Sequence, residues 1–265
     1  MTFSIIGTGN MAWFLAKRLT TAGHQCIGIY GRDKAATIEL AEWIQAKSYS
    51  NIADIYDGEI DVCLLSISDH AIETVAPGLH FKKTVLIHTA GSVDLDLLSK
   101  SAVDYAVLWP VYSVVKNNLP NHRNIPCAWQ ASTPKAQRYV LSLAHGITDV
   151  IFEAKDEQRK WLHLSAVVCN NFVNHLMAIG EQTCHDQQLD FNILHPIIAQ
   201  TFERLQKTSP FLLQTGPAKR GDSITIARHM KLLDNNTDWQ RVYSAITTSI
   251  ENMYRQNDTK NEVKP

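Results

Sequence analysis

The chain has 265 residues and a formal net charge of −1 at neutral pH, from 25 lysines and arginines against 26 aspartates and glutamates. This balance offers nucleic acid no attractive long-range field, and no basic stripe occurs, so we expect no nucleic-acid partner. Its apolar runs fall far short of about 18 residues, so we expect no membrane-spanning segment. The N-terminus enters a strand pattern at once, without the basic region and hydrophobic stretch of a signal peptide.

Five scattered cysteines are present: Cys26, Cys63, Cys127, Cys169 and Cys184. Their odd number and the lack of a Cys-x-x-Cys pair argue against a disulfide framework and a structural zinc site. A reducing cytosol is the natural location for such a protein. None of the eleven histidines forms a His-x-x-x-His or Cys-x-x-His pair, so we expect no metal site.

Short apolar runs alternate with helical patterns through about residue 153. The pattern predicts strands at Thr2–Gly7, Cys26–Tyr30, Ala46–Tyr49, Ile60–Ser66, Thr84–His88, Tyr105–Trp109, Ile125–Ala131 and Thr148–Phe152. It predicts helices at Met11–Thr21, Lys34–Gln45, His70–Ala76, Leu95–Leu98 and Lys135–His145, and a polar loop at Asn117–Asn124. This rhythm indicates an α/β fold of the Rossmann type, with a mainly parallel sheet covered on both faces.

The pattern changes after about Glu153 to helices alone. Helical stretches are predicted at Asp156–Asp186, Ile193–Lys207, Ser223–Asn235 and Trp239–Gln256, before a polar tail, Asn257–Pro265, that we expect to fray. The first far exceeds the mean helix length of about 11–12 residues, which is typical of a domain core or a subunit interface. We therefore predict a nucleotide-binding domain at residues 1–153 and an all-α domain for substrate binding and dimerisation at 154–265.

The strongest motif is Gly7-Thr8-Gly9-Asn10-Met11-Ala12, which follows a predicted strand and opens a helix. Gly7 permits a tight turn, Gly9 lets backbone approach a pyrophosphate, and Ala12 keeps the helix close to the strand. The helix N-terminus would offer free N–H groups to phosphate. A glycine turn without a ligand is the alternative, but the strand and helix context favours a dinucleotide site.

The end of the second strand distinguishes between cofactors. NAD-specific sites usually place an acidic residue there for the ribose hydroxyls, whereas this chain has Tyr30-Gly31-Arg32-Asp33-Lys34. Arg32 could bind a 2′-phosphate with help from Lys34, and Asp33 is better placed to cap the next helix. We therefore predict NADP(H), although Arg32 as an ordinary exposed arginine stays open.

Two further strand ends should face the same crevice. Ser66-Ile67-Ser68-Asp69 ends the fourth strand and His88-Thr89-Ala90-Gly91-Ser92 the fifth. Backbone near Ile67 and Thr89 would flank the nicotinamide and its ribose. Asp69 is interpreted as a helix cap, and Ser92 as a substrate contact. His88 is either a substrate ligand or a packed strand-end residue.

Candidate proton donors and substrate contacts follow later in the chain. Tyr112, after the strand at Tyr105–Trp109, could donate a proton to a carbonyl or imine, unless it is a packed aromatic residue. Polar residues on the long helix could line the cleft, bond between helices or subunits, or form a solvated polar face; they are His163, Asn170, Asn171 and Asn174. Trp161, Leu164, Val168, Phe172 and Ile179 follow helical spacing and are interpreted as a core stripe. Thr215–Asp222 is interpreted as an ordered loop in which Arg220 could bind an anionic group and Asp222 could cap a helix.

Together these motifs resemble a group of uncharacterised Rossmann-like proteins with a helical C-terminal domain of unknown function, in the 6-phosphogluconate dehydrogenase-like clan. That clan includes pyrroline-5-carboxylate reductase, ketopantoate reductase and the β-hydroxyacid dehydrogenases. The resemblance covers most of the chain. It rests on Gly7–Ala12, Leu64–Asp69, His88–Ser92, Trp109–Ser113, His163 with Asn171-Phe172, and Thr215–Asp222 with His229. It implies a homodimer with the helical domain at the interface.

One departure from the clan concerns catalysis. β-Hydroxyacid dehydrogenases have a catalytic lysine four residues before an asparagine on the first long helix. Counting back from Asn171 and Asn170 gives Val167 and Ala166, so no lysine is present. His163, one turn earlier, is the substitute candidate.

We therefore expect an NADPH-dependent oxidoreductase that reduces a small carbonyl or imine compound. His163 or Tyr112 would supply the proton and Asn171 would orient the substrate, since the hydride chemistry belongs to the cofactor. The main alternative is a non-catalytic dimer that senses the NADP(H) pool, which the missing lysine favours. A methyltransferase is a third possibility, but the short Gly7–Ala12 loop and Arg32 suit a dinucleotide better.

Overall fold

The structure is a computed structural model that describes the backbone of residues 1–261 and the side chains of residues 1–255. The chain divides into two compact units, Met1–Asn171 and Phe172–Pro265. The sheet ends at Glu153, where the predicted first domain also ends, and the first unit continues along the following helix.

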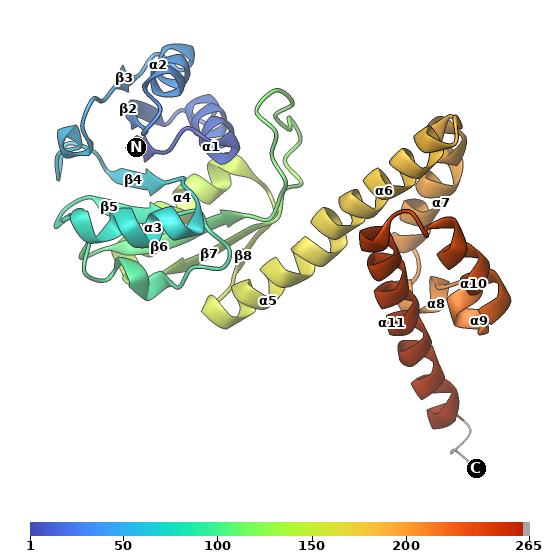
Figure 1. Cartoon of the computed structure of the whole chain (residues 1–265). Helices are drawn as coiled ribbons and strands as arrows, with labels where there is room; N and C mark the ends of the chain where they lie inside the picture. The colour runs from blue at the N-terminus through green and yellow to red at the C-terminus, as the bar shows by residue number, and fades with distance from the viewer. Residues whose placement is uncertain (262–265) are drawn as a thin grey trace. The chain divides into compact units, whose positions relative to one another are not determined.

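The first unit is built on one eight-stranded sheet in the order β3-β2-β1-β4-β5-β6-β7-β8 (Figure 1). Its strands are β1 Thr2–Ile6, β2 Gln25–Tyr30, β3 Lys47–Ser48, β4 Val62–Leu65, β5 Val85–His88, β6 Tyr105–Pro110, β7 Cys127–Ala131 and β8 Ile151–Glu153. Neighbouring strands are parallel, except that β6 and β7 are antiparallel. The prediction of a mainly parallel Rossmann-type sheet is therefore confirmed.

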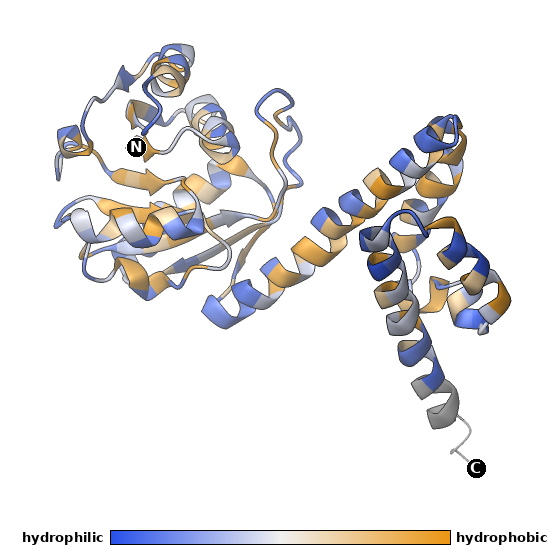
Figure 2. Cartoon of the chain, in the orientation of Figure 1, coloured by the Kyte–Doolittle hydropathy of each residue, from blue (hydrophilic) through white to orange (hydrophobic). Residues whose placement is uncertain are grey.

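Alternate residues of the central strands enter two separate cores. In β4, Leu64 packs into a core with Phe14 of the helix Asn10–Thr21, whereas Leu65 packs on the opposite face with Ile72 of the helix Asp69–Val75. Because side chains of a strand point alternately to the two faces, this division shows that both faces are covered. Figure 2 shows the corresponding hydrophobic strands at the centre of the unit. The covering helices are α1 Asn10–Thr21, α2 Lys34–Trp43, α3 Asp69–Val75 and α4 Pro134–Ile147, with short 3-10 turns η1 Ile52–Asp54, η2 Ala76–Gly78 and η3 Leu95–Leu98.

The helix after the sheet carries a π-helical segment. It runs as α5 Asp156–Ala166, η4 Val167–Phe172 and α6 Val173–Asp186. The prediction of one long helix is confirmed. The expectation that it keeps an α-helical period throughout is wrong, because the π segment has more residues per turn than an α-helix. By length and composition alone, Asp156–Asp186 could cross a membrane, and the side chains of its most apolar window are not buried.

The second unit contains helices only among its described residues. After α6 come η5 Phe191–Leu194, α7 His195–Leu205, α8 Pro210–Leu213, α9 Pro217–Arg220, α10 Ser223–Leu232 and α11 Thr237–Asn261. The predicted loop at Thr215–Asp222 contains the short helix α9, and Asp222 caps α10 as predicted by accepting from the Thr225 N–H at 3.0 Å. The predicted frayed tail is helical through Asn261, and its last part, residues 262–265, lies outside the described residues.

A buried arginine fixes the start of α5 against the sheet. Arg159 has no exposed surface, and its guanidinium donates to the Val93 carbonyl and to the Gln130 side chain on β7. It also forms an ion pair with Asp156 at 2.9 Å, and Asp156 accepts from the Leu95 N–H at 3.1 Å. A buried guanidinium needs such partners, because an unpaired buried charge is strongly unfavourable.

We expect Arg159→Met to lower the free energy of unfolding by about 3 kcal/mol, because it leaves buried acceptors on Val93 and Gln130 without a donor. Urea unfolding followed by circular dichroism measures this. The control is Lys160→Met, whose solvent-exposed ion pairs with Asp94 and Glu157 should contribute much less to the free energy of unfolding. Equal losses in the two variants would contradict the role of Arg159.

Candidate functional site

A cleft of about 510 Å³ crosses the carboxyl ends of the parallel strands. Its walls come from the turns after β1, β2, β4 and β5, and its lining residues include Gly7, Thr8, Gly9, Asn10, Met11, Tyr30, Arg32, Asp33, Ser66, Ile67, Ser68, Asp69, Thr89 and Ala90. Ligands of open α/β sheets bind at this edge. The structure thus brings together the predicted cofactor-binding residues, apart from Ala12, which is buried behind the turn in the core.

The first turn is shaped for close approach. Gly7 has a φ of +129°, and a Cβ on it would overlap the Ser66 carbonyl, so this position requires glycine. A Cβ on Gly9 would instead point into open space, where the pyrophosphate of a dinucleotide could lie. Gly9 caps α1 without a side-chain hydrogen bond, and the first turn of α1 has no acidic residue. The N–H groups at this end therefore remain able to bind phosphate, so the residues fit a dinucleotide.

Arg32 and Asp33 take the predicted positions at the end of β2. Asp33 caps α2 by accepting from the Ala36 N–H at 3.1 Å. Arg32 is exposed, lines the cleft and forms no ion pair with another described residue. An unpaired guanidinium beside a carboxylate already used as a cap suits a 2′-phosphate better than a pair of ribose hydroxyls.

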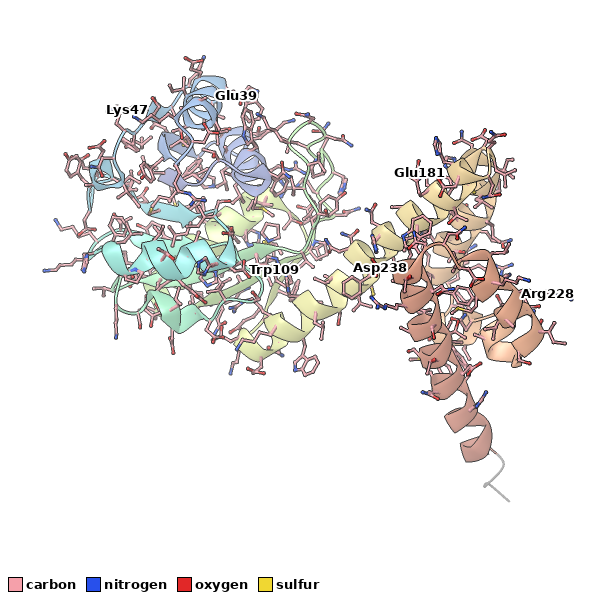
Figure 3. All side chains as sticks on the ribbon, in the orientation of Figure 1. Glu39, Lys47, Trp109, Glu181, Arg228 and Asp238 are labelled. Carbon is pink, nitrogen blue, oxygen red and sulfur yellow. The ribbon has the colours of Figure 1, made fainter. Side chains whose placement is uncertain are left out.

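A second cavity of about 540 Å³ contains the candidate proton donors. Trp109, at the end of β6, is labelled in Figure 3. The cavity is lined by Trp109, Val111, Tyr112, Ser113, His163, Ala166, Val167, Cys169, Asn170 and Asn171. In a regular helix, Asn171 would point about 80° away from His163. Asn171 nevertheless lines the same cavity as His163 and Asn170, and it lies within the π segment η4. Such π segments often occur at functional sites.

The turn after β5 separates the two cavities. Ala90 lines the cleft, whereas a Cβ on Gly91 would lie 2.6 Å from the Trp109 ring and 2.9 Å from the His163 ring. The centroids of those two rings are 5.7 Å apart. The missing side chain of Gly91 therefore lets His163 lie directly against the turn whose other side faces the cleft.

The hydroxyl of Tyr112 already has a partner that the sequence did not reveal. It lies 3.3 Å from Nε2 of His122, and the rings meet edge to face. His122 belongs to the same connection between β6 and β7, residues 111–126. Spacing within an irregular loop gives no sequence signal for such a pair.

The 111–126 loop is attached to the glycine turn. The Lys116 N–H donates to Oδ1 of Asn10 at 3.0 Å, and its ammonium group pairs with Glu39 at 2.7 Å. The same ammonium lies 4.1 Å from the centroid of the Trp13 ring. Asn10 therefore positions the loop that carries Tyr112, in addition to forming part of the cleft wall.

His88 does not face either cavity. Its side chain is fully buried, and Nδ1 accepts from the Ala90 N–H at 3.2 Å. Burial lowers the pKa of His88 to about 3, with a smaller contribution from the Arg159 guanidinium. The substrate contact considered for His88 is therefore wrong in this structure: a neutral, packed imidazole holds the turn after β5.

Asp69 is not the helix cap that we expected. Ser68 is the N-cap residue of α3, and Asp69 is its first helical residue. The Asp69 carboxylate accepts a hydrogen bond from the Ser92 hydroxyl, which joins the turns after β4 and β5. Asp69 and Ser92 follow the adjacent parallel strands β4 and β5, and this position was the feature of the sequence that could have indicated their contact.

Arg220 lies in the second unit, at the end of α9. It is exposed and lines a small cavity of about 250 Å³ with residues that include Lys219, Glu251 and Tyr254. A separate apolar cavity of about 430 Å³ in this unit contains His229, whose Nδ1 lies 2.8 Å from the Tyr243 hydroxyl. An anion contact by Arg220 stays a prediction.

Comparison with known families agrees with this architecture. Residues 2–91 match the family described as NADP oxidoreductase, coenzyme F420-dependent, and residues 125–250 match a domain of unknown function, DUF2520. The chain joins an NADP-oxidoreductase-like Rossmann domain to a DUF2520-like domain. This confirms the expected oxidoreductase class and NAD(P)(H) binding. The second match begins before β7, so it covers the last two strands of the sheet as well as most of the helical region.

Solved structures resemble the chain over nearly its whole length. A proposed NADP oxidoreductase from Bacteroides fragilis is 28% identical, with a TM-score of 0.88 over 95% of this chain and 98% of that one. A Thermotoga maritima protein is 21% identical, with a TM-score of 0.69 over 97% and 99% of the two chains. Pyrroline-5-carboxylate reductase from Streptococcus pyogenes is 18% identical, with a TM-score of 0.62 over 95% and 98%. The last two show the shared fold alone, and no curated protein matches the chain.

His88 should make the stability depend on pH. Its pKa is about 3 when folded and about 6.5 when unfolded, so the unfolded chain takes up the proton first as pH falls. We expect the His88 contribution to be complete above pH 6.5 and to fall by about 2 kcal/mol between pH 7 and pH 5. Urea unfolding at both pH values measures it. His88→Asn keeps an acceptor for Ala90 and should show a smaller fall; an unchanged fall would contradict the assignment.

Proposed function

We propose that the chain is an NADP(H)-dependent reductase of a small carbonyl or imine compound. The observation that carries the NADP preference is the unpaired Arg32 beside the capping Asp33. Gly7, Gly9 and the N-terminal turn of α1 would hold the pyrophosphate, and the turns at Ser66–Ser68 and at Thr89 would flank the nicotinamide end. Its cysteines are all unpaired, which suits the reducing cytosol.

The second cavity would bind the substrate. When bound, the reduced nicotinamide supplies a hydride. His163 would give a proton to the reduced group, and the amides of Asn170 and Asn171 would orient the substrate by hydrogen bonds. Tyr112, whose hydroxyl lies 3.3 Å from Nε2 of His122, would be the alternative proton donor. Ser92 would contact the substrate from the turn after β5. Support comes from the position of His163 against Gly91, at the wall between the two cavities.

The cofactor preference is tested by titration with NADPH and NADH, followed by nicotinamide fluorescence. Arg32→Ala should weaken NADPH binding by tenfold or more, because a charge-assisted phosphate contact is lost, and should leave NADH binding nearly unchanged. Lys47→Ala is the matched control, since Lys47 is an exposed cation on β3 that does not line the cleft. The proposal fails if wild-type protein binds neither nucleotide.

A non-catalytic NADP(H) sensor is the second candidate, because Val167 and Ala166 stand where related dehydrogenases have lysine. The two candidates differ in one property. A reductase consumes NADPH in the presence of a suitable carbonyl or imine compound, and the combined His163→Ala and Asn171→Ala changes should abolish that consumption. A sensor binds the nucleotide, and these changes alter only its stability.

We propose further that the chain forms a homodimer through its long helix. The stripe expected to be core is exposed within one chain: Trp161 is 67% and Phe172 56% exposed, and Leu164 and Val168 are also exposed. A continuous row of large apolar side chains on one helix face is typical of a protein interface. A second copy of the chain is the occupant that the family resemblance implies.

Analytical ultracentrifugation tests the dimer. Val168→Glu should shift the wild-type dimer to monomer at micromolar concentration, because it places a charge in an apolar interface. Asn174→Glu adds the same charge to a different face of the helix and should leave the dimer intact. A monomeric wild-type protein would contradict the proposal.

A further inference from the structure

We infer that the second cavity, which contains His163, selects an electrically neutral aromatic ketone or aldehyde over a substrate that carries a carboxylate or an ammonium group. This inference rests on the proposed reductase function and names its substrate class. The cavity has a volume of about 540 Å³, within the range of roughly 300–1,000 Å³ that is usual for small-molecule sites. All of its described lining residues belong to the first unit.

The walls of this cavity carry no fixed charge. Its described lining residues include no lysine, arginine, aspartate or glutamate, and among them only His163 can carry a positive charge. Cations of the adjoining segments are already paired: Lys116 and Arg123 with acidic side chains at 2.7 and 2.8 Å, and the buried Arg159 with Asp156. A charged substrate would therefore lose its hydration on entering without gaining a counter-charge, whereas a neutral one loses much less.

The walls offer aromatic rings and free hydrogen-bonding groups instead. The ring centroids of Trp109 and His163 are 5.7 Å apart with their planes inclined at 53°, and Tyr112 is 43% exposed. A flat ring packs well against such side chains. The side-chain amides of Asn170 and Asn171 form no hydrogen bond with another described residue, so their N–H groups are available to a carbonyl oxygen.

A neutral carbonyl compound also uses the proton that the cavity supplies. The carbonyl carbon accepts the hydride, with its electron pair, as a new C–H bond, and the C=O π pair moves to oxygen. The oxygen then takes a proton from the His163 imidazolium and becomes a hydroxyl group. Substrate and product are both neutral, so the positive charge passes from His163 to the oxidised nicotinamide. A protonated imine would need no such proton and would meet no carboxylate in the described lining.

The first test uses three unreactive probes of nearly the same shape that differ in charge: benzamide, benzoate and benzamidinium. Each is titrated by ligand-observed NMR into the NADPH-loaded protein at about pH 8, where histidine side chains are mostly neutral. Bound NADPH prevents a probe from taking the place of the nicotinamide. We expect the wild-type protein to bind benzamide about tenfold more tightly than either charged probe, because only benzamide keeps no ionic hydration to lose.

Charge variants of Val167 test whether the probes bind in this cavity. Val167 lines the cavity, whereas Ser165, on α5, does not. Val167→Lys should shift the binding preference about tenfold toward benzoate, and Val167→Glu about tenfold toward benzamidinium, because each adds the opposite charge to the wall. Ser165→Lys adds a charge outside the lining and is the matched control, which should keep the preference for benzamide. Thermal unfolding checks that each variant is folded.

The aromatic part of the inference is tested with cyclohexanecarboxamide, which carries the same neutral amide on a puckered ring. We expect it to bind the wild-type protein about fivefold more weakly than benzamide, because it cannot stack on the aromatic side chains of the cavity. Tyr112→Leu should reduce this difference.

The outcomes separate this inference from the proposed function. If the wild-type protein does not bind NADPH, both fail. If it binds NADPH but does not bind benzamide more tightly than the two charged probes, the neutral substrate class is wrong and the reductase function is unaffected. A preference for benzamide that neither Val167 variant changes overturns the assignment of the substrate to this cavity. Equal binding of the two amides contradicts the aromatic class.

Discussion

The hydrogen bonds of one buried guanidinium determine where the candidate chemistry lies. Arg159 joins the segment after β5, the side chain of Gln130 on β7 and the first turn of α5. One helical turn later on the same face, His163 then meets Gly91 and Trp109. If this attachment were looser, the helix could tilt, and the wall between the cofactor cleft and the second cavity would lose its shape. Arg159, which lines neither cavity, therefore holds the wall between them in place.

Much of the first unit could be predicted because its signals are local. Apolar runs such as Val62–Leu65 are buried on both faces, and they alternate with helices whose starts carry recognisable residues. The glycine turn could be predicted for the same reason, because Gly7 adopts a positive φ that other residues adopt only with strain. The cap at Asp33 followed from its position directly before a helix.

The remaining features depend on contacts between distant segments. The π segment at Val167–Phe172 has no distinctive composition, so a regular period was the natural assumption, and that period puts Asn171 about 80° from His163 around the helix. Asp69 could cap a helix or pair with Ser92, and only the juxtaposition of two strand ends decides between these. His88 shows the same limit, because a histidine at a strand end can be a ligand or packing, and burial settles which.

The attachment of the 111–126 loop to the glycine turn has an entropic consequence. Long loops without regular structure usually sample many conformations, and ordering them costs roughly 1–2 kcal/mol per residue. Here Lys116 already holds the loop through Asn10, Glu39 and Trp13. Much of this ordering therefore takes place when the chain folds, before any ligand arrives. A small molecule with few contacts can then bind usefully, because little of its interaction energy is consumed in immobilising the protein.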